Sequence, residues 1–149
     1  MPTEIAETFR RELDDVHTAL FAVSPALADI PWRPGGWNRK QIVGHLVDSA
    51  TNNRQRFVRA AIEGAYSGPG YAQDAWVAAQ GYADQSWDDL LLWWSAEHQI
   101  LIAAVDRITD ERLGAMCRVG EDEPVTLRFL IEDYVRHQRH HLGQITSGS

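Results

Sequence analysis

The sequence contains a single cysteine, Cys117, and fewer basic than acidic residues. One cysteine excludes an internal disulfide and a zinc site built on cysteines, and its place in a predicted connector favours an ordinary thiol over a nucleophile. The 14 Lys and Arg residues against 21 Asp and Glu give a net charge of −7. Nucleic-acid binding needs a clustered basic face, so it is not expected. The run Arg54, Arg56 and Arg59 fits a solvated helix face, with an anion contact as the alternative.

The sequence also lacks an apolar run of the roughly 20 residues that a membrane span needs. Its densest apolar stretch, residues 90–94, is soon followed by Glu97 and His98. The N-terminus is acidic rather than basic, and no apolar segment follows it, so a secretory signal is not predicted. We therefore expect a cytoplasmic protein with no membrane partner.

Four segments show apolar residues at helical spacing. They span residues 3–23, 38–64, 86–105 and 126–145. A shorter helix is predicted at 74–80, in the connector between the second and third long helices. No segment alternates convincingly with a period of two, so no sheet is expected. The pattern predicts one all-α domain over residues 1–149, a four-helix bundle with a short extra helix.

Residues at the ends of these segments support the assignment. Asn38 followed three positions later by Gln41 is a capping-box pattern, and Ser86 is a good N-cap for the third helix. Gly64 is a suitable stop for the second helix. Residues 26–37 contain several prolines and glycines, which indicates a structured loop rather than a linker between domains.

Two histidines of the fourth helix, His137 and His141, have the spacing of a metal-ligand pair. Four residues apart, they lie one turn apart on the same face, with Cβ atoms roughly 5–6 Å from each other. They fall on or beside the apolar stripe that contains Tyr134 and Ile145. A metal ion would satisfy one nitrogen of each ring, whereas each unpaired buried polar group costs about 1–3 kcal/mol. Helix-surface or polar core roles are the alternatives.

A third ligand must come from another helix, and His45 is the best candidate. It lies one position from the stripe formed by Ile42 and Leu46. The neighbouring Gly44 would let another backbone segment come close. The alternative is a histidine at the polar flank of its helix, and the residues alone do not decide between the two.

The remaining three histidines have weaker claims to such a site. His140 points about 100° away from His141 on the helix wheel, which favours a solvent-facing or supporting position. His98 lies on the inner stripe of the third helix and fits either a pocket wall or a hydrogen-bonded core position. His17 on the first helix has the same two interpretations.

Two blocks of the sequence, residues 31–49 and 137–145, resemble the DinB/YfiT-like superfamily, and the segment between them also fits. The first block contains the run Gly-His-Leu-Val-Asp-Ser around His45, and the second ends in His-Leu-Gly-Gln-Ile. The resemblance implies a four-helix bundle in which His45, His137 and His141 bind one divalent metal, nickel or zinc. It also implies a homodimer, with water in the remaining coordination positions.

Three histidines with open positions form a catalytic type of site rather than a closed structural one. The metal could activate a water for hydrolysis, or bind and deprotonate a thiol for attack on an electrophile. The resemblance favours a transferase that uses a low-molecular-weight thiol and a small-molecule substrate. A metal-dependent hydrolase and a non-catalytic, stress-associated metal-binding dimer are the alternatives.

Three further residues are candidates for supporting roles. Asp48 and Asp133 each lie about one turn from a proposed ligand and could accept its N–H, which would fix the tautomer of the ring. An ordinary helix-surface carboxylate is the alternative for both. Trp37, just before the second helix, either packs or lines a pocket at that end.

Overall fold

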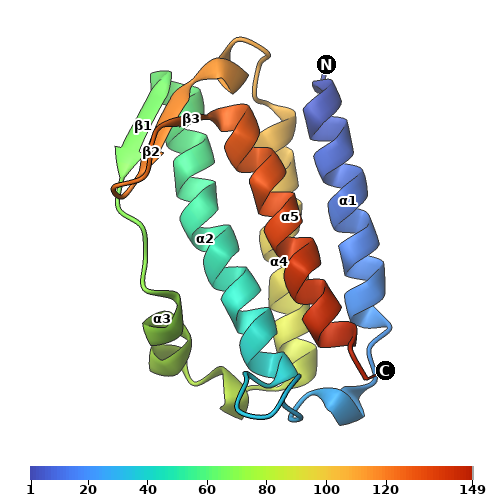
Figure 1. The fold of residues 1–149 in the computed structure, drawn as a ribbon. Helices are drawn as coiled ribbons and strands as arrows, with labels where there is room; N and C mark the ends of the chain where they lie inside the picture. The colour runs from blue at the N-terminus through green and yellow to red at the C-terminus, as the bar shows by residue number, and fades with distance from the viewer. Residues whose placement is uncertain (149) are drawn as a thin grey trace.

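The computed structural model describes residues 1–148 and consists mainly of long helices (Figure 1). The long helices are α1 (Glu4–Phe21), α2 (Arg39–Glu63), α4 (Trp87–Asp106) and α5 (Leu127–Thr146). Helices α4 and α5 each pack against both α1 and α2. Therefore α1 and α2 stand at opposite corners of the bundle. The predicted four-helix bundle is confirmed.

Each long helix begins at a side chain that caps its first turn. The capping residues are Thr3, Asn38, Ser86 and Thr126. The capping box predicted for α2 is present: Gln41 N donates to Asn38 Oδ1, and Asn38 N donates to Gln41 Oε1, both at 2.9 Å. The helix ends at Gly64, which has a φ of 81° that favours glycine. Local sequence signals thus fix both ends of α2.

A small sheet at one end of the bundle shows that the expectation of no sheet was wrong. Its strands are β1 (Ala65–Gly68), β2 (Met116–Val119) and β3 (Val125–Thr126), in the order β1-β2-β3. Strand β1 pairs with β2 in parallel, and β2 pairs with β3 antiparallel. The strands have two to four residues, which is too short for a period of two to be recognised. Cys117, expected in an irregular connector, is buried in β2, and burial raises the pKa of its thiol.

The connector between α2 and α4 contains the predicted short helix, α3 (Gln73–Gln80), followed by a 3₁₀ turn, η2 (Tyr82–Asp84). The ring of Tyr82 packs directly on Gly44 of α2, where a Cβ atom would lie 2.1 Å from a ring carbon. The Tyr82 hydroxyl donates to Asp48 Oδ1 at 2.5 Å. Gly44 therefore permits a close approach, as predicted, but by an aromatic side chain rather than by a backbone.

Apolar side chains fill the bundle in two clusters. The cluster near the sheet includes Phe9, Phe57, Leu101 and Ile131, and the cluster at the other end includes Val16, Leu46, Trp94 and Ile145. On α4 and α5, the buried polar residues His98 and Gln138 lie between the two clusters in sequence. Among the helices of residues 1–148, none has the length and apolar character needed to cross a membrane.

Candidate metal centre

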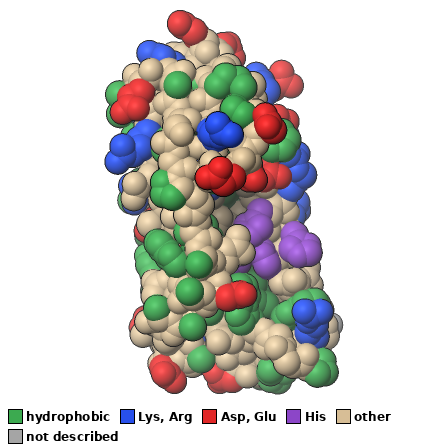
Figure 2. Space-filling model, turned by 60° about the vertical axis from the view of Figure 1, so that its left-hand side comes forward, with side chains coloured by type: hydrophobic (Ala, Val, Ile, Leu, Met, Phe, Trp, Pro, Cys, Tyr) green, Lys and Arg blue, Asp and Glu red, His purple; other side chains and the backbone are tan. Residues whose placement is uncertain are grey.

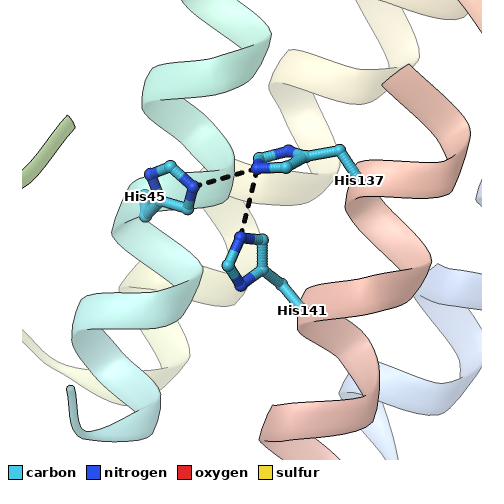
Figure 3. Close-up of side chains that lie close together, drawn as sticks. All are labelled: His45, His137 and His141. Carbon is cyan, nitrogen blue, oxygen red and sulfur yellow. Dashed lines mark hydrogen bonds between the residues drawn. The ribbon is translucent and has the colours of Figure 1, made fainter. Parts of the chain in front are cut away.

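Three histidine side chains meet between α2 and α5 (Figure 3). His45 comes from α2, and His137 and His141 come from successive turns of α5. The Nε2 atom of His137 lies 3.2 Å from Nε2 of His45 and 3.1 Å from Nε2 of His141. One ring nitrogen of each residue lies within 4.8 Å of the others. The structure thus brings together, as one histidine triad, the three residues that the sequence put forward as ligands.

The donor set of the triad fits a divalent metal ion. Three nitrogens held about 2.1 Å from one cation stand roughly 3.0–3.4 Å apart, for octahedral to tetrahedral angles. The two Nε2 separations given above fall within that range. Within the part of the chain that the structure describes, no carboxylate or thiol joins this cluster. Three neutral ligands would leave coordination positions open, as in catalytic zinc sites.

Burial keeps the imidazoles of the triad neutral. Burial, followed by the neighbouring His141 and His137, lowers the pKa of His45 to about 3. Burial and then His141 lower the pKa of His137 to about 4. Burial also lowers the pKa of His141. At neutral pH each ring therefore has a lone pair to offer, because a histidine must be deprotonated to bind a metal.

Gln144 orients one ring of the triad. Its Oε1 atom accepts a hydrogen bond of 2.7 Å from Nδ1 of His141. This bond places the proton of the neutral ring on Nδ1 and leaves Nε2 as the free lone pair. The Nδ1 atom of His45, in contrast, is buried with no hydrogen-bond partner in residues 1–148. No role was predicted for Gln144, although its spacing of three residues from His141 on one helix was an available signal.

The loop before α2 places Trp37 against the triad. Its ring centroid lies 5.0 Å from that of His45, with the planes tilted by 44°. Trp37 is half-buried and, together with Trp32, lines a cavity that reaches His141. Both interpretations of Trp37 are therefore observed, because the side chain also packs against the apolar cluster at this end of the bundle.

The two carboxylates predicted to support the ligands have other partners. Asp48 Oδ1 accepts hydrogen bonds from the Tyr82 hydroxyl at 2.5 Å and from the Gln80 side-chain amide at 2.9 Å. Burial raises the pKa of Asp48. Asp133 forms a 3.4 Å ion pair with Arg136 on the exposed side of α5. The two carboxylates do lie about one turn from His45 and His137. However, Asp48 hydrogen-bonds to the connector that contains α3, and Asp133 is half-exposed. Neither therefore orients a ligand in this structure.

The other histidines lie outside the triad. Nδ1 of His98 donates to the Trp94 carbonyl at 2.7 Å, and its Nε2 accepts from the Tyr134 hydroxyl at 2.6 Å. Burial lowers the pKa of His98 to about 4, so the ring is neutral. It is therefore a hydrogen-bonded core residue, one of its two predicted interpretations. Neither His17 nor His140 belongs to the cluster.

Two cavities reach the triad. One, of about 310 Å³, is lined by His137 and by later turns of α2 that include Ser49 and Arg56. The other, of about 410 Å³, is lined by His141 and by the loop before α2, including Trp37. Helices α2 and α5 run antiparallel (Figure 1). The residues that line the two cavities therefore place them on either side of the triad along the helices. Arg56 is buried, so the solvated face expected for it was wrong.

The surface around the triad is hollowed, and histidine side chains gather there (Figure 2). In this view, charged side chains of both signs lie above the hollow, and hydrophobic and charged side chains lie below it. The triad is thus reachable from the surface through a hollow that has charged side chains on both sides.

Comparison with known proteins identifies a family to which this chain is similar. The family model described as the DinB superfamily matches residues 8–145. The chain is 30% identical over 131 residues to Putative metal-dependent hydrolase YfiT of Bacillus subtilis strain 168, covering 86% of this chain and 72% of that protein. It is 28% identical over 148 residues to a protein of Bacillus cereus strain B4264 with the same kind of name, covering 97% of this chain and 85% of the relative.

Solved structures show the same fold. The structure of YfiT from Bacillus subtilis, described as an unusual four-helix bundle topology, superposes with a TM-score of 0.85 at 25% identity and covers 98% of this chain and 86% of that chain. A mycothiol-dependent maleylpyruvate isomerase superposes with a TM-score of 0.79 at 14% identity. That match covers 98% of this chain but only 61% of the isomerase, and it is a likeness of fold alone.

Proposed function

Because this chain belongs to the DinB superfamily and gathers three neutral imidazoles at one point, we propose that it is a metal-dependent enzyme. His45, His137 and His141 would hold one divalent metal ion, nickel or zinc. The reaction that we propose is the transfer of a low-molecular-weight thiol to a small electrophilic substrate.

The observation that carries this proposal is the pair of cavities at the triad. Thiol transfer brings two organic molecules to one metal, whereas hydrolysis brings one organic molecule and a water. His137 borders a cavity of about 310 Å³, and His141 borders a separate cavity of about 410 Å³. Two spaces of this size, each reaching a different ligand, suit a two-substrate reaction.

A divalent metal bound by three imidazoles acts as a Lewis acid that favours loss of a proton from a bound thiol or water. In the proposed reaction the thiol releases its proton to solvent, its sulfur bonds to an electrophilic carbon, and the electron pair of the broken bond leaves with the displaced group. The role of the protein is to bind and orient the two substrates. Gln144 holds the His141 ring, and Trp37 shields the His45 ring from water.

Metal-dependent hydrolysis is the second candidate, and the names of the two Bacillus relatives favour it. It would use the same triad with water in place of the thiol. In that case the substrate would occupy one of the two cavities, and a thiol would have no effect on the rate.

Elemental analysis of protein purified from its native host tests the metal, and a panel of small thiols tests the reaction. We expect one equivalent of nickel or zinc per chain, and thiol binding that is measurable by calorimetry. Conjugation of the thiol to monochlorobimane should be faster than the uncatalysed reaction. His141→Ala should lose both properties, whereas His140→Ala, which alters the neighbouring exposed histidine, should keep both.

Other results would support other functions. Turnover of an ester panel without a thiol would support the hydrolase. Stoichiometric metal with no activity on either panel, combined with a lower melting temperature of His141→Ala, would assign the triad a structural role. Protein that never holds stoichiometric metal would contradict the proposal.

A further inference from the structure

The cavity that His137 borders contains a buried cation with few partners. Arg56 on α2 is 9% exposed. Its guanidinium makes two long hydrogen bonds, 3.5 Å to Asn53 Oδ1 and 3.4 Å to the Pro69 carbonyl. Within residues 1–148 it forms no ion pair with a carboxylate. Arg56 is thus a largely buried arginine that lines the cavity and has only two long contacts, so its guanidinium can donate to an anionic ligand there.

Arg56 and the triad share one face of the bundle. Arg56 follows His45 by eleven residues on α2, which is about three helical turns and a rotation of only about 20°. The rise corresponds to roughly 16 Å between the two Cα atoms, and the long arginine side chain can shorten that gap. The cavity of about 310 Å³ is lined by both Arg56 and His137. A single ligand in this cavity can therefore contact Arg56 at one end and the triad at the other.

Other groups in the cavity limit the charge of such a ligand. The Tyr71 hydroxyl is buried and has no hydrogen-bond partner of ordinary geometry in residues 1–148, although Ser49 lies beside it. Burial raises the pKa of Tyr71 to about 12, so the hydroxyl stays a neutral donor. Asp122 and Asp133 line the same cavity and would repel a second negative charge. Arg56 and Tyr71 together therefore suit a monoanion.

We propose that Arg56 binds the carboxylate of a substrate whose reacting end lies at the triad, and that the Tyr71 hydroxyl donates a second contact. A planar guanidinium matches a carboxylate because two parallel N–H···O bonds can form. This inference rests on the proposed function and specifies its substrate class. At least one substrate is a small carboxylic acid whose carboxylate is separated by several bonds from the reacting sulfur or carbon.

Binding of hexanoate tests the carboxylate site without requiring a reaction. Calorimetry on metal-loaded protein would compare hexanoate with hexanamide, which has the same chain and no charge. Arg56→Gln should weaken hexanoate binding roughly 10–100-fold, because one charge-assisted contact is lost, and should leave hexanamide binding unchanged. Arg59→Gln, which alters an exposed arginine on the same helix, should bind hexanoate like the wild type.

Thermal unfolding separates ligand binding from a structural role of Arg56. Because Arg56→Gln removes a poorly compensated buried charge, the melting temperature of the ligand-free variant should be equal to or higher than that of the wild type. A lower melting temperature together with wild-type affinity for hexanoate would overturn the inference. Binding of 6-mercaptohexanoate and of 6-mercaptohexanol then shows which substrate has the carboxylate. If Arg56→Gln weakens binding of the acid only, the carboxylate belongs to the thiol substrate. If it weakens binding of neither, the carboxylate belongs to the electrophile.

The experiment distinguishes this inference from the proposed function. If the protein holds no metal but hexanoate affinity depends on Arg56, the metal-dependent function fails and the carboxylate site stands. If metal and thiol bind as proposed but Arg56→Gln binds hexanoate like the wild type, the carboxylate site is wrong and the function stands.

Discussion

The core histidine His98 and the histidine triad differ in the partners of their ring nitrogens. In the core, both nitrogens of His98 have partners, the Trp94 carbonyl and the Tyr134 hydroxyl. At the triad, Nε2 of His137 lies 3.2 Å from Nε2 of His45 and 3.1 Å from Nε2 of His141. A neutral imidazole has one donor and one acceptor nitrogen, so three Nε2 atoms at one point cannot all satisfy each other.

The hydrogen-bond partners of the ring nitrogens, rather than burial, distinguish His98 from the triad. Burial lowers the pKa of His98 to about 4 and contributes most to the same value for His137. The pKa therefore does not tell the two sites apart. A ring with both nitrogens paired stabilises the core, whereas a lone pair that converges with two others is available to a cation.

The largest expected effect comes from removing one ring of the triad. Nε2 of His137 lies within 3.2 Å of both other Nε2 atoms, and His137→Ala leaves only two of the three ligands. We expect metal affinity to fall more than about 100-fold, because loss of a mere supporting contact already costs about 10–100-fold. Competition with a chromophoric chelator measures this affinity. His140→Ala is the matched control, and wild-type affinity in His137→Ala would place the metal elsewhere.

Removing the core histidine should lower the stability of the protein and leave metal binding unchanged. His98→Ala leaves a cavity beside Trp94 and removes the acceptor of the buried Tyr134 hydroxyl. We expect the free energy of unfolding to fall by about 3 kcal/mol, as measured by denaturant titration. Metal stoichiometry should stay that of the wild type. Loss of metal from a folded His98→Ala protein would mean that the two histidine sites are not independent.

A smaller effect is expected from the residue that orients His141. Gln144→Leu removes the acceptor of the Nδ1 proton but keeps the size of the side chain. Metal affinity should fall about 10–100-fold, with little change in the stability of the metal-free protein. Gln144→Glu retains an acceptor and should keep most of the affinity. Equal affinities of all three proteins would show that packing alone orients the ring.

Local signals explain why most of the fold was predictable. The capping box at Asn38 and Gln41 and the apolar spacing of the long helices are properties of neighbouring residues, and the structure contains both. The sheet depends instead on pairing between residues 65–68 and 116–119, which are far apart in sequence. Its strands are too short to have a pattern of their own.

The same distinction applies to the candidate site. The pair His137 and His141 was readable because helix geometry fixes their relative positions. That His45 reaches them depends on how α2 packs against α5, so the residues alone left it undecided. Likewise, Arg56 had the local pattern of a solvated face, and its burial depends on packing against segments outside its helix, including a contact with the Pro69 carbonyl.

A pH dependence of stability due to His98 is also expected. An unfolded histidine titrates near pH 6.5, whereas the folded pKa of His98 is about 4. Between these values the unfolded chain binds a proton that the folded protein does not bind. The free energy of unfolding therefore falls as the pH falls through this window, and this term is constant above it. One such group contributes a slope of at most about 1.4 kcal/mol per pH unit.

His98→Gln removes this titration and leaves the triad in place. Denaturant titrations of the metal-free wild type and variant, from about pH 7.5 to about pH 4.5, bracket most of the window. The stability advantage of the wild type should shrink as the pH falls, because only the wild type loses the His98 contribution. The triad histidines titrate in both proteins, so their contributions cancel in the difference. If the difference in free energy of unfolding between the two proteins stayed constant across this range, protonating His98 would not destabilise the fold. The two hydrogen bonds of His98 would then not explain how it differs from the triad.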